Sequence, residues 1–423
     1  MSQPRVVISG LGFVTSIGNS KSSVRDSLHS LKTGIEPIEF KPGVKLPVSV
    51  AGTIKGFDTQ SMSWAGWTWP EGYTFARDVL RNMPPHGLYA LCATEQMVAD
   101  SKLSPELLSS DETALFCSSA GSPKLLAHYL HQIVDSKGQR VPPAGVVSTI
   151  AGTLNFHLAA HYHIHGAVVG FSSACASTTQ ALGYGFDEIR LGRHKRVIVV
   201  GGEEVGLEAT YTFHGMRALS RQSDPIKASR PFDKQRDGFV GTGGSVALVI
   251  EERETALKRG APIYAEIVGW GQAGDGHNPA ISDPEGNGLA TAMKRALRAS
   301  QLEANAIEYV NAHATSTPAG DASEAYALKQ IFTRAGVTPK ISSTKALTGH
   351  GLSMSGAMET AFCALALSEG FVPGSAHITE LDSVCDGLNI IQKTERFSPR
   401  YILKNSSGFG GSNVSLVLRS VVN

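Results

Sequence analysis

The feature that most constrains the fold is a short pattern near the start of each half of the chain. Residues 6–12 read VVISGLG, and residues 265–271 read AEIVGWG. In both places an apolar segment runs into two glycines that are separated by one residue. Such a segment is typical of a buried strand, and we interpret the first glycine pair as a turn that closes a strand over residues 6–9. The recurrence predicts a core that is built twice.

Strand and helix patterns alternate after both copies of this pattern. In the first half we expect helices over residues 88–103 and 176–191, and strands over residues 115–119, 196–201 and 245–251. In the second half we expect helices over residues 288–300, 323–335 and 355–369, and strands over residues 308–312, 401–404 and 414–419. This alternation predicts a layered α/β fold. A chain of 423 residues is long enough for two halves, which we place at residues 1–252 and 253–423.

Composition argues against several classes of protein. The chain is 42% hydrophobic and 18% charged, as globular proteins are, and its net charge of +1 favours neither nucleic acid nor an anionic membrane. No run of about 18 apolar residues predicts a membrane span, and the first residues show no signal-peptide pattern. The five cysteines are scattered without a CxxC pair, which favours free thiols in a reducing compartment and hence a cytoplasmic protein.

Two motifs resemble ligand sites but lack a required residue. The GLG of residues 10–12 lacks the further glycine of a dinucleotide-binding fingerprint, because position 15 is Thr15. His157 and His161 have the spacing of a helical zinc site, but no glutamate follows His157. We therefore expect neither a dinucleotide nor a metal.

Residues 56–85 form an irregular segment that is rich in tryptophan. Aromatic-rich loops of this length usually pack on a neighbouring element or on a partner subunit. We expect one of these two arrangements here.

Cys175 is the first candidate for chemistry. It follows an apolar segment and the small residues at 172–174, and a helical pattern begins directly after it. A helix N-terminus lowers the pKa of a thiol and leaves backbone N–H groups that can hold an oxyanion. A reactive thiolate and a buried structural cysteine are both compatible with this local context.

Further segments carry polar side chains next to the ends of predicted elements. His313 directly follows a predicted strand, and Lys345 and His350 precede a helix that carries Glu359. A glycine loop between two strands and a charged turn complete the set, at residues 405–413 and 230–239. Each segment is common by itself, but the order Cys, His, Lys with a second His, and then GFGG is rare.

In this order of motifs the chain resembles the β-ketoacyl-acyl-carrier-protein synthases, the condensing enzymes of the thiolase superfamily. It is most similar to the elongating type of bacterial fatty-acid synthesis. The resemblance covers nearly the whole chain, is strongest from about residue 166 onward, and is weak around residues 56–85. It implies a thiolase-like fold of five layers, αβαβα, made from two pseudo-duplicated halves. The first half would carry the cysteine, and the second would carry the histidines, the lysine and the GFGG loop.

The resemblance also implies a Cys-His-His site. Cys175 matches the acyl-accepting nucleophile, and His313 and His350 match the two histidines that act on the malonyl unit. Lys345 matches a buried lysine that orders the site, with Glu359 as its charge partner. Phe409 matches a gating phenylalanine, and its N–H would join that of the cysteine in an oxyanion hole. Gly410, in the same loop, matches a glycine that contacts substrate. Thr315 and Thr317 match two threonines that hydrogen-bond the pantetheine arm.

The implied reaction is a decarboxylative Claisen condensation. An acyl group on Cys175 would be joined to malonyl-acyl-carrier-protein, giving 3-oxoacyl-acyl-carrier-protein and CO2. Loss of CO2 makes an enolate, which two neutral imidazole N–H donors would stabilise; losing one such donor typically costs about 10²–10³ in rate. Cys175 at a helix start would supply the thiolate for thioester exchange. No cofactor is implied beyond the phosphopantetheine of the carrier protein.

Partners follow from the same resemblance. The family presents basic residues to an acidic acyl carrier protein at the positions of Lys137, Arg140 and Arg217. A homodimer is implied, and a heterodimer of two similar subunits stays open. We expect no nucleic-acid partner and no membrane insertion.

The sequence departs from the elongating enzymes at three places. Ala314 stands where Gly is usual, residues 241–244 read GTGG in place of a GDG-type turn, and residues 275–278 read DGHN where the family usually has Asp, a small residue, Tyr and His. The alanine variant also occurs in condensing enzymes of specialised polyketide and aryl-polyene pathways. Fatty-acid elongation and a specialised pathway therefore both stay open.

Two other functions compete with an active condensing enzyme. A non-catalytic partner of the same fold, which sets chain length in a heterodimer, usually lacks the nucleophile, whereas Cys175 and both histidines are present here. A cysteine hydrolase is compatible with the spacing of Cys175 and His313, but it would not need Lys345 or His350.

Overall fold

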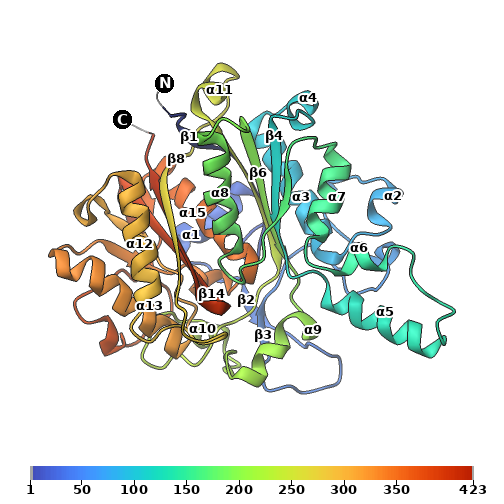
Figure 1. Ribbon diagram of the computed structural model, residues 1–423. Coiled ribbons are helices and arrows are strands. Elements are labelled where there is room, and N and C mark those ends of the chain that lie inside the picture. Colours follow the sequence, from blue (N-terminus) through green and yellow to red (C-terminus); the bar gives the residue numbers. More distant parts are fainter. Residues whose placement is uncertain (1–2, 422–423) are drawn as a thin grey trace.

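The structure, a computed structural model, describes residues 3–421 and has five layers of helices and strands, in the order αβαβα (Figure 1). Helices α8 and α15 form the central layer between two halves of a sheet. Helices α3 and α7 cover the outer face of the first half, and α12 and α13 cover the outer face of the second half. The predicted α/β fold with five layers is therefore confirmed.

The longer helices are α1 (Lys21–Ser30), α3 (Pro85–Ser101), α5 (Pro123–Asp135), α7 (Thr153–Tyr162), α8 (Ser177–Arg190), α12 (Asn287–Ser300), α13 (Pro318–Ile331) and α15 (Ser355–Glu369). The shorter helices are α2 (Arg77–Leu80), α4 (Pro105–Leu108), α6 (Gly145–Thr149), α9 (Leu207–Thr210), α10 (Pro225–Ala228), α11 (Arg253–Lys258) and α14 (Lys345–Thr348). The strands of the main sheet are β1 (Val6–Val14), β4 (Thr113–Ser118), β5 (Val168–Gly170), β6 (Arg196–Glu203), β7 (Gly244–Glu252), β8 (Ala265–Gly274), β9 (Tyr309–Asn311), β10 (Lys340–Ser342), β12 (Asn389–Ile390), β14 (Tyr401–Gly408) and β15 (Ser412–Arg419). Two small sheets pair β2 (Ile35–Pro37) with β3 (Val50–Gly52) and β11 (Phe371–Val372) with β13 (Glu395–Arg396).

The main sheet repeats one strand order on both sides of its centre. The order is β12-β10-β9-β14-β15-β8-β1-β7-β6-β4-β5, and the two sides meet where β1 pairs antiparallel with β8. Outward from that junction, the strands are β1-β7-β6-β4-β5 on one side and β8-β15-β14-β9-β10 on the other. If the strands of each series are numbered by their order in the sequence, both series read first, fifth, fourth, second, third. The topology is therefore built twice, while the boundary at residue 252 stays a prediction.

The glycines of the repeated pattern lie inside strands, so the predicted turn after residue 9 is wrong. Strand β1 continues past both of its glycines, and so does β8. A Cβ on Gly12 would lie 1.8 Å from the carbonyl oxygen of Ala93 in α3, and a Cβ on Gly271 would lie 2.5 Å from that of Ala292 in α12. Each glycine lets the backbone of an outer helix touch the strand, and this close contact explains why the pattern occurs in both halves.

Two predicted elements differ from the observed ones at the ends that lead to the site. Helix α13 begins at Pro318, five residues before the expected start, with Thr317 as the cap and proline in the first turn. Strand β14 continues to Gly408, four residues beyond the expected end, because its polar residues 404–406 are fully buried and remain paired with β15. The polar residues from 405 onward predict a loop, whereas the side chains of this part of β14 find partners inside the molecule.

The tryptophan-rich segment packs on the first half of the molecule. Trp67 is buried, and its Nε1 donates a hydrogen bond to the carbonyl oxygen of Ser61 over 2.8 Å. Trp64 and Trp69 pack against the apolar cluster that includes α3. The expected packing on a neighbouring element is therefore confirmed. Among the described helices, none combines the length and the apolarity that crossing a membrane requires.

Candidate active site

Cys175 lies on a tight turn between β5 and α8. Ala174 has a φ of +48°, a strained backbone conformation for a residue with a Cβ, and such strain is often found at functional sites. The amide of Ala176 donates to the carbonyl oxygen of Ser173 over 3.1 Å, and the Ser177 hydroxyl donates to that of Ala174 over 2.6 Å. This turn presents the thiol just before the first turn of α8, where the sequence predicts it.

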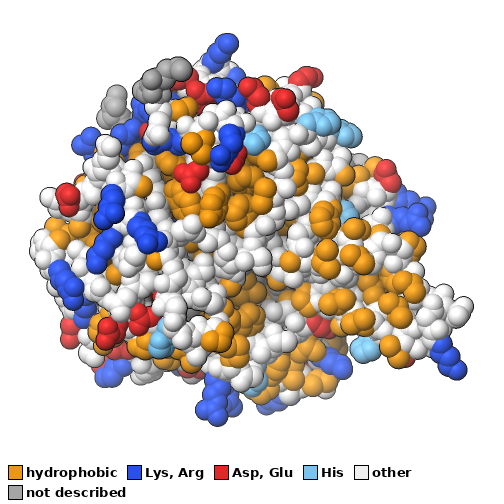
Figure 2. Space-filling view, in the orientation of Figure 1, with side chains coloured by type: hydrophobic (Ala, Val, Ile, Leu, Met, Phe, Trp, Pro, Cys, Tyr) orange, Lys and Arg blue, Asp and Glu red, His pale blue; other side chains and the backbone are white. Residues whose placement is uncertain are grey.

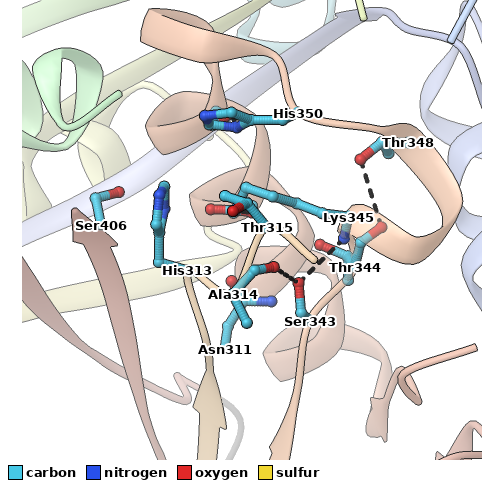
Figure 3. Close-up of polar contacts among 12 residues, drawn as sticks. Asn311, His313, Ala314, Thr315, Ser343, Thr344, Lys345, Thr348, His350 and Ser406 are labelled. Atoms are coloured by element: carbon cyan, nitrogen blue, oxygen red, sulfur yellow. Dashed lines mark hydrogen bonds and ion pairs between the residues drawn. The ribbon is translucent and has the colours of Figure 1, made fainter. Parts of the chain in front are cut away.

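The two predicted histidines lie beside this thiol. Nε2 of His350 is 2.9 Å from Sγ of Cys175, and the ring centroids of His313 and His350 are 5.4 Å apart. His313 follows β9 and His350 follows α14, so the second half of the chain supplies both rings. Figure 3 shows the rings approaching each other from these separate segments. Residues far apart in the sequence are thus brought together around one sulfur.

His350 has a hydroxyl partner on its other ring nitrogen. Nδ1 lies 3.1 Å from Oγ of Ser355, the first residue of α15. A hydroxyl can donate or accept, so this contact suits either tautomer of the ring. Nε2 can therefore offer a proton toward Cys175 or accept one from it. Sequence reasoning missed Ser355, because a serine at a helix start has an ordinary capping explanation.

Both imidazoles are neutral in this environment. Burial lowers the pKa of His313 and of His350 well below the usual value, and the nearby ammonium groups of Lys345 and Lys404 lower it further. Neutral rings keep one N–H each at pH 7. They can therefore act as hydrogen-bond donors, which is the chemistry expected from the sequence.

The thiol is also neutral at rest, and this corrects the expectation of a preformed thiolate. Burial raises the pKa of the Cys175 thiol to about 12, although Lys345 lowers it in part. The N-terminus of α8 stabilises an anion at this position, but desolvation of the sulfur is the larger effect. The thiol proton must then leave during attack, and Nε2 of His350 is placed to accept it.

A buried cluster of charges lies next to the histidines. Nζ of Lys345 forms an ion pair with Oε1 of Glu359, and both side chains are almost completely buried. These are the two residues that the resemblance pairs. A second lysine, Lys404 of β14, places its Nζ 3.3 Å from Oε2 of the same carboxylate. Sequence reasoning missed Lys404, although a charge directly after the apolar run YIL was a usable signal.

Two buried carboxylates of α13 hold the loop that carries His313. Glu324 accepts hydrogen bonds from the amides of His313, over 3.0 Å, and of the residue after it. Asp321 accepts the amide of Thr315 over 2.9 Å. Arg236, from the charged turn noted in the sequence, places its Nε 3.5 Å from Oδ2 of Asp321. The turn therefore supports the site from behind, and the two carboxylates were not foreseen.

The glycine loop lies against the backbone of Cys175. A Cβ on Gly408 would lie 3.0 Å from the amide nitrogen of Cys175, so a side chain there would push the two segments apart. Phe409 follows, begins the 3-10 turn η7 (Phe409–Gly411), and places its ring centroid 5.8 Å from that of Phe213. The amides expected to form the oxyanion hole thus belong to segments in contact, and the oxyanion hole stays a prediction.

A second loop holds the glycine loop in place. Gly410, with a φ of +80°, donates its amide hydrogen to the carbonyl oxygen of Pro279 over 2.7 Å. The amide of Asp275 donates to the carbonyl oxygen of Gly411 over 2.9 Å, and Asn413 donates to Oδ1 of Asp275 over 2.7 Å. The DGHN segment begins at Asp275, so its differences from the family, at His277 and Asn278, lie close in the chain to the place where the two loops meet.

Thr315 and Thr317 line a cavity that ends at Cys175. Their hydroxyl oxygens are 3.1 Å apart, and Phe409 and both histidines line the same cavity. The cavity volume is about 80 Å³, and one water molecule needs about 10–15 Å³ by the same measure. An acyl thioester therefore enters only if lining side chains move. Phe409, whose side chain is 39% exposed, is part of this lining.

The three basic residues expected to dock a carrier protein fall in two regions. Arg217 follows the 3-10 helix η2 (Tyr211–Met216) and adjoins Ala218 of the cavity lining. Lys137 and Arg140 follow α5, which extends away from the body of the molecule (Figure 1). Arg217 is thus next to a lining residue in the chain, and none of the three basic residues lines the cavity.

His161, one of the two α7 histidines with the spacing of a zinc site, has ordinary structural contacts. Nε2 of His161 lies 3.9 Å from a carboxylate oxygen of Glu95 on α3, and its ring packs edge-on against Tyr162. Within residues 3–421, no group of three or more His, Cys, Asp or Glu side chains is arranged to hold a metal ion.

Comparison with known proteins shows that the chain belongs to the β-ketoacyl synthase family. The family's N-terminal domain matches residues 3–256, and its C-terminal domain matches residues 264–379. The chain is 37% identical to 3-oxoacyl-[acyl-carrier-protein] synthase 1 of Escherichia coli strain K12, across 99% of both chains. It is 31% identical to a solved β-ketoacyl synthase from Burkholderia phymatum STM815, with a TM-score of 0.90 over 99% of this chain and 100% of that one. It is 27% identical to the solved ishigamide ketosynthase/chain length factor, with a TM-score of 0.88 over 99% of this chain and 100% of that one.

Proposed function

We propose that this protein is a 3-oxoacyl-acyl-carrier-protein synthase that elongates acyl chains in fatty-acid synthesis. It joins an acyl group on Cys175 to malonyl-acyl-carrier-protein and releases CO2. The observation that carries this proposal is the contact of 2.9 Å between Nε2 of His350 and Sγ of Cys175. The ring centroid of His313 lies 5.4 Å from that of His350. The named relatives support the same activity, since they match the chain from end to end.

The first half-reaction is acyl transfer to the sulfur. Sγ of Cys175 attacks the carbonyl carbon of an acyl thioester, and the thiol proton passes to Nε2 of His350. The oxyanion that forms is held by the amides of Cys175 and Phe409. The intermediate then breaks the bond to the pantetheine sulfur, which leaves with the proton as a thiol. His350 returns to its neutral form, with Ser355 as the partner of Nδ1.

The second half-reaction makes the carbon–carbon bond. The malonyl carboxylate leaves as CO2, and the electrons of the broken bond form an enolate whose oxygen accepts the N–H of His313 and that of His350, which is then in its Nε2–H tautomer with Nδ1 facing the Ser355 hydroxyl. The enolate carbon attacks the carbonyl carbon of the acyl group on Cys175. Collapse of this intermediate expels the Cys175 sulfur as a thiolate, which takes a proton from solvent. The product is the 3-oxoacyl thioester on the carrier protein.

Replacing the nucleophile tests the proposal. Cys175→Ala should abolish transfer of a radiolabelled acyl group to the protein and 3-oxoacyl product formation. Cys92→Ala, at a buried cysteine outside the site, is the matched control and should keep both activities. Retention of elongation by Cys175→Ala, or failure of the wild-type chain to elongate, would contradict the proposal.

A specialised ketosynthase that works beside a chain-length partner is the second candidate. The ishigamide ketosynthase/chain length factor, at 27% identity, is the observation that favours it. Mass spectrometry of the acyl group trapped on Cys175 in cells separates the two, because elongation of fatty acids would leave saturated chains of several lengths. A conjugated or aryl chain would instead support the specialised pathway. The presence of Cys175 and both histidines argues against a non-catalytic chain-length partner.

An exposed sheet edge supports the homodimer. Strand β5 is the last strand of the sheet, and its residues Val168 and Val169 are 40% and 38% exposed. Figure 2 shows hydrophobic side chains gathered over α5, α6 and α7 on the same side of the molecule. An unpaired edge beside apolar surface is a ready site for pairing with a second chain. We infer that a second copy covers it, and a similar subunit in a heterodimer would use the same edge.

The acyl carrier protein is the expected donor of both substrates. Arg217 adjoins the cavity lining, where its charge suits an acidic partner at the entrance. Lys137 and Arg140 could serve the same partner only from another face, since they follow α5. A cytoplasmic location stays a prediction, and the five free thiols are its support.

A further inference from the structure

Lys404 is a buried lysine to which the steps above give no role. Its side chain is 0% exposed in the middle of β14. Nζ donates hydrogen bonds to Oγ1 of Thr179, over 2.9 Å, and to Oγ of Ser406, and these two hydroxyl oxygens are 2.8 Å apart. Thr179 lies in the first turn of α8, behind Cys175, and Figure 3 shows Ser406 beside His313. The ammonium is therefore anchored between the nucleophile's helix and a catalytic histidine.

Lys404 changes the net charge of the buried ion cluster next to the histidines. Lys345 and Lys404 both contact the single carboxylate of Glu359, so two cations share one anion. A buried lysine with its own carboxylate would be neutral as a pair, whereas this trio carries a net positive charge. Burial of an unbalanced charge is costly.

The other ionisable groups around Lys404 do not cancel this charge. Cys363 of α15 has a raised pKa because it is buried, so it faces Lys404 as a neutral thiol. His313 and His350 are neutral for the reasons given above. Glu324 lies on the far side of the His313 loop, where backbone amides and Asn405 already occupy its oxygens.

We propose that Lys404 is a positioning residue for decarboxylation, and that its ammonium, held by Thr179 and Ser406, supplies a positive charge behind the two histidines. This proposal rests on the condensation proposed above. A positive charge in a dry site stabilises the enolate that forms when CO2 leaves. It also opposes protonation of both rings, so each keeps the neutral form that donates N–H. The malonyl half-reaction should need this charge more than acyl transfer does.

The charge should be lost in mildly alkaline solution. Burial lowers the pKa of Lys404 to about 8, and Glu359 opposes part of that effect. The ammonium is present below this pKa and absent above it. Decarboxylation by the wild-type protein should therefore decline as the pH rises through about 8, and a variant without the amine should not show this decline.

The test compares Lys404→Met with the wild-type protein in both half-reactions. CO2 release from malonyl-carrier protein should fall about tenfold at pH 7, less than the loss of a direct donor. The decline near pH 8 should disappear, and acyl transfer should change less than about threefold. Lys340→Met is the control and should match the wild type. Lys340 pairs with Glu395, and neither residue lines the cavity at Cys175. Equal rates and identical pH profiles for Lys404→Met and wild type would overturn the proposal.

A second measurement does not depend on the folding of that variant. In the wild-type protein with ¹⁵N-labelled histidine, the ring resonances of His313 and His350 should shift near pH 8 as the ammonium loses its charge. Rings that sense no titration between pH 7 and 9 would overturn the inference. This measurement also tests the inference separately from the proposed function. A wild-type chain that cannot elongate acyl chains contradicts the proposed function. Ring resonances that shift near pH 8 still report the charge of Lys404 in that case.

Discussion

At the scale of single residues, the candidate nucleophile and the histidine beside it are neutral groups that become charged only during the proposed reaction. The thiol of Cys175 and the imidazole of His350 are 2.9 Å apart, and burial disfavours the charged form of each. Burial therefore disfavours an ion pair between these two side chains before substrate binds. The proton is therefore transferred as the sulfur bonds to carbon. The charges of Lys345 and Lys404 then act on transient anions.

The two histidines should be needed unequally by the two half-reactions. His313→Ala removes an N–H donor to the enolate, so CO2 release should fall by about 10²–10³, whereas acyl transfer to Cys175 should fall less than about tenfold. Because the pKa of His313 lies well below its usual value, wild-type CO2 release should be constant between pH 6.5 and 7.5. Both half-reactions can be followed with labelled acyl and malonyl thioesters.

An exposed histidine provides the control for this comparison. His131 lies on α5, outside the cavity, and His131→Ala should leave both half-reactions unchanged. Equal losses of acyl transfer and CO2 release in His313→Ala would contradict the role of donor and would indicate a general structural function for the ring.

At the scale of elements, close contact between strand and helix explains the repeated glycine pattern. Helix α12 crosses β8 so closely that a Cβ on Gly271 would lie 2.5 Å from the Ala292 carbonyl oxygen. Backbone atoms cannot turn aside as a flexible side chain does. Any side chain at this position must push the outer helix away from the sheet.

Gly271→Ala should therefore destabilise the protein by about 2–3 kcal/mol, the scale of overpacking a tight core. Gly274→Ala in the same strand is the matched control, since a Cβ there has open space, and its effect should be within about 0.5 kcal/mol. Urea unfolding followed by circular dichroism measures both. Coincident unfolding curves for the two variants would contradict the steric explanation.

The element patterns that could be predicted were those with a strong period. Helix α15 and strand β6 carry continuous apolar runs, and their positions were confirmed to within two residues. The extension of β14 over residues 405–408 could not be predicted, because polar side chains in this part of the strand find partners on α8 and α13, which are distant in the sequence. The site residues Cys175, His313 and His350 followed from motif order. Lys404 and Glu324 did not, because their roles depend on contacts that only the folded chain creates.

At the scale of the whole molecule, the main sheet of the described residues ends in an edge strand on each side. The two halves join through β1 and β8, so the first and last strands of the sheet are β12 and β5. At the β5 edge, exposed apolar side chains continue from the strand onto α5 and α6. A stable interface generally buries about 1,200–2,000 Å² in total, and we propose this continuous surface as the place for it.

A charge on this edge should separate the subunits. Val169→Lys places an ammonium in a β5 interface, where it has no partner and would have to be desolvated. Light scattering after gel filtration should give twice the chain mass of 44.7 kDa for the wild type and 44.7 kDa for the variant. Leu257→Lys, at a residue 47% exposed on α11, is the control for adding a lysine at an exposed apolar site and should remain dimeric. A wild-type monomer, or a Val169→Lys variant that stays dimeric at micromolar concentration, would show that β5 does not pair two copies.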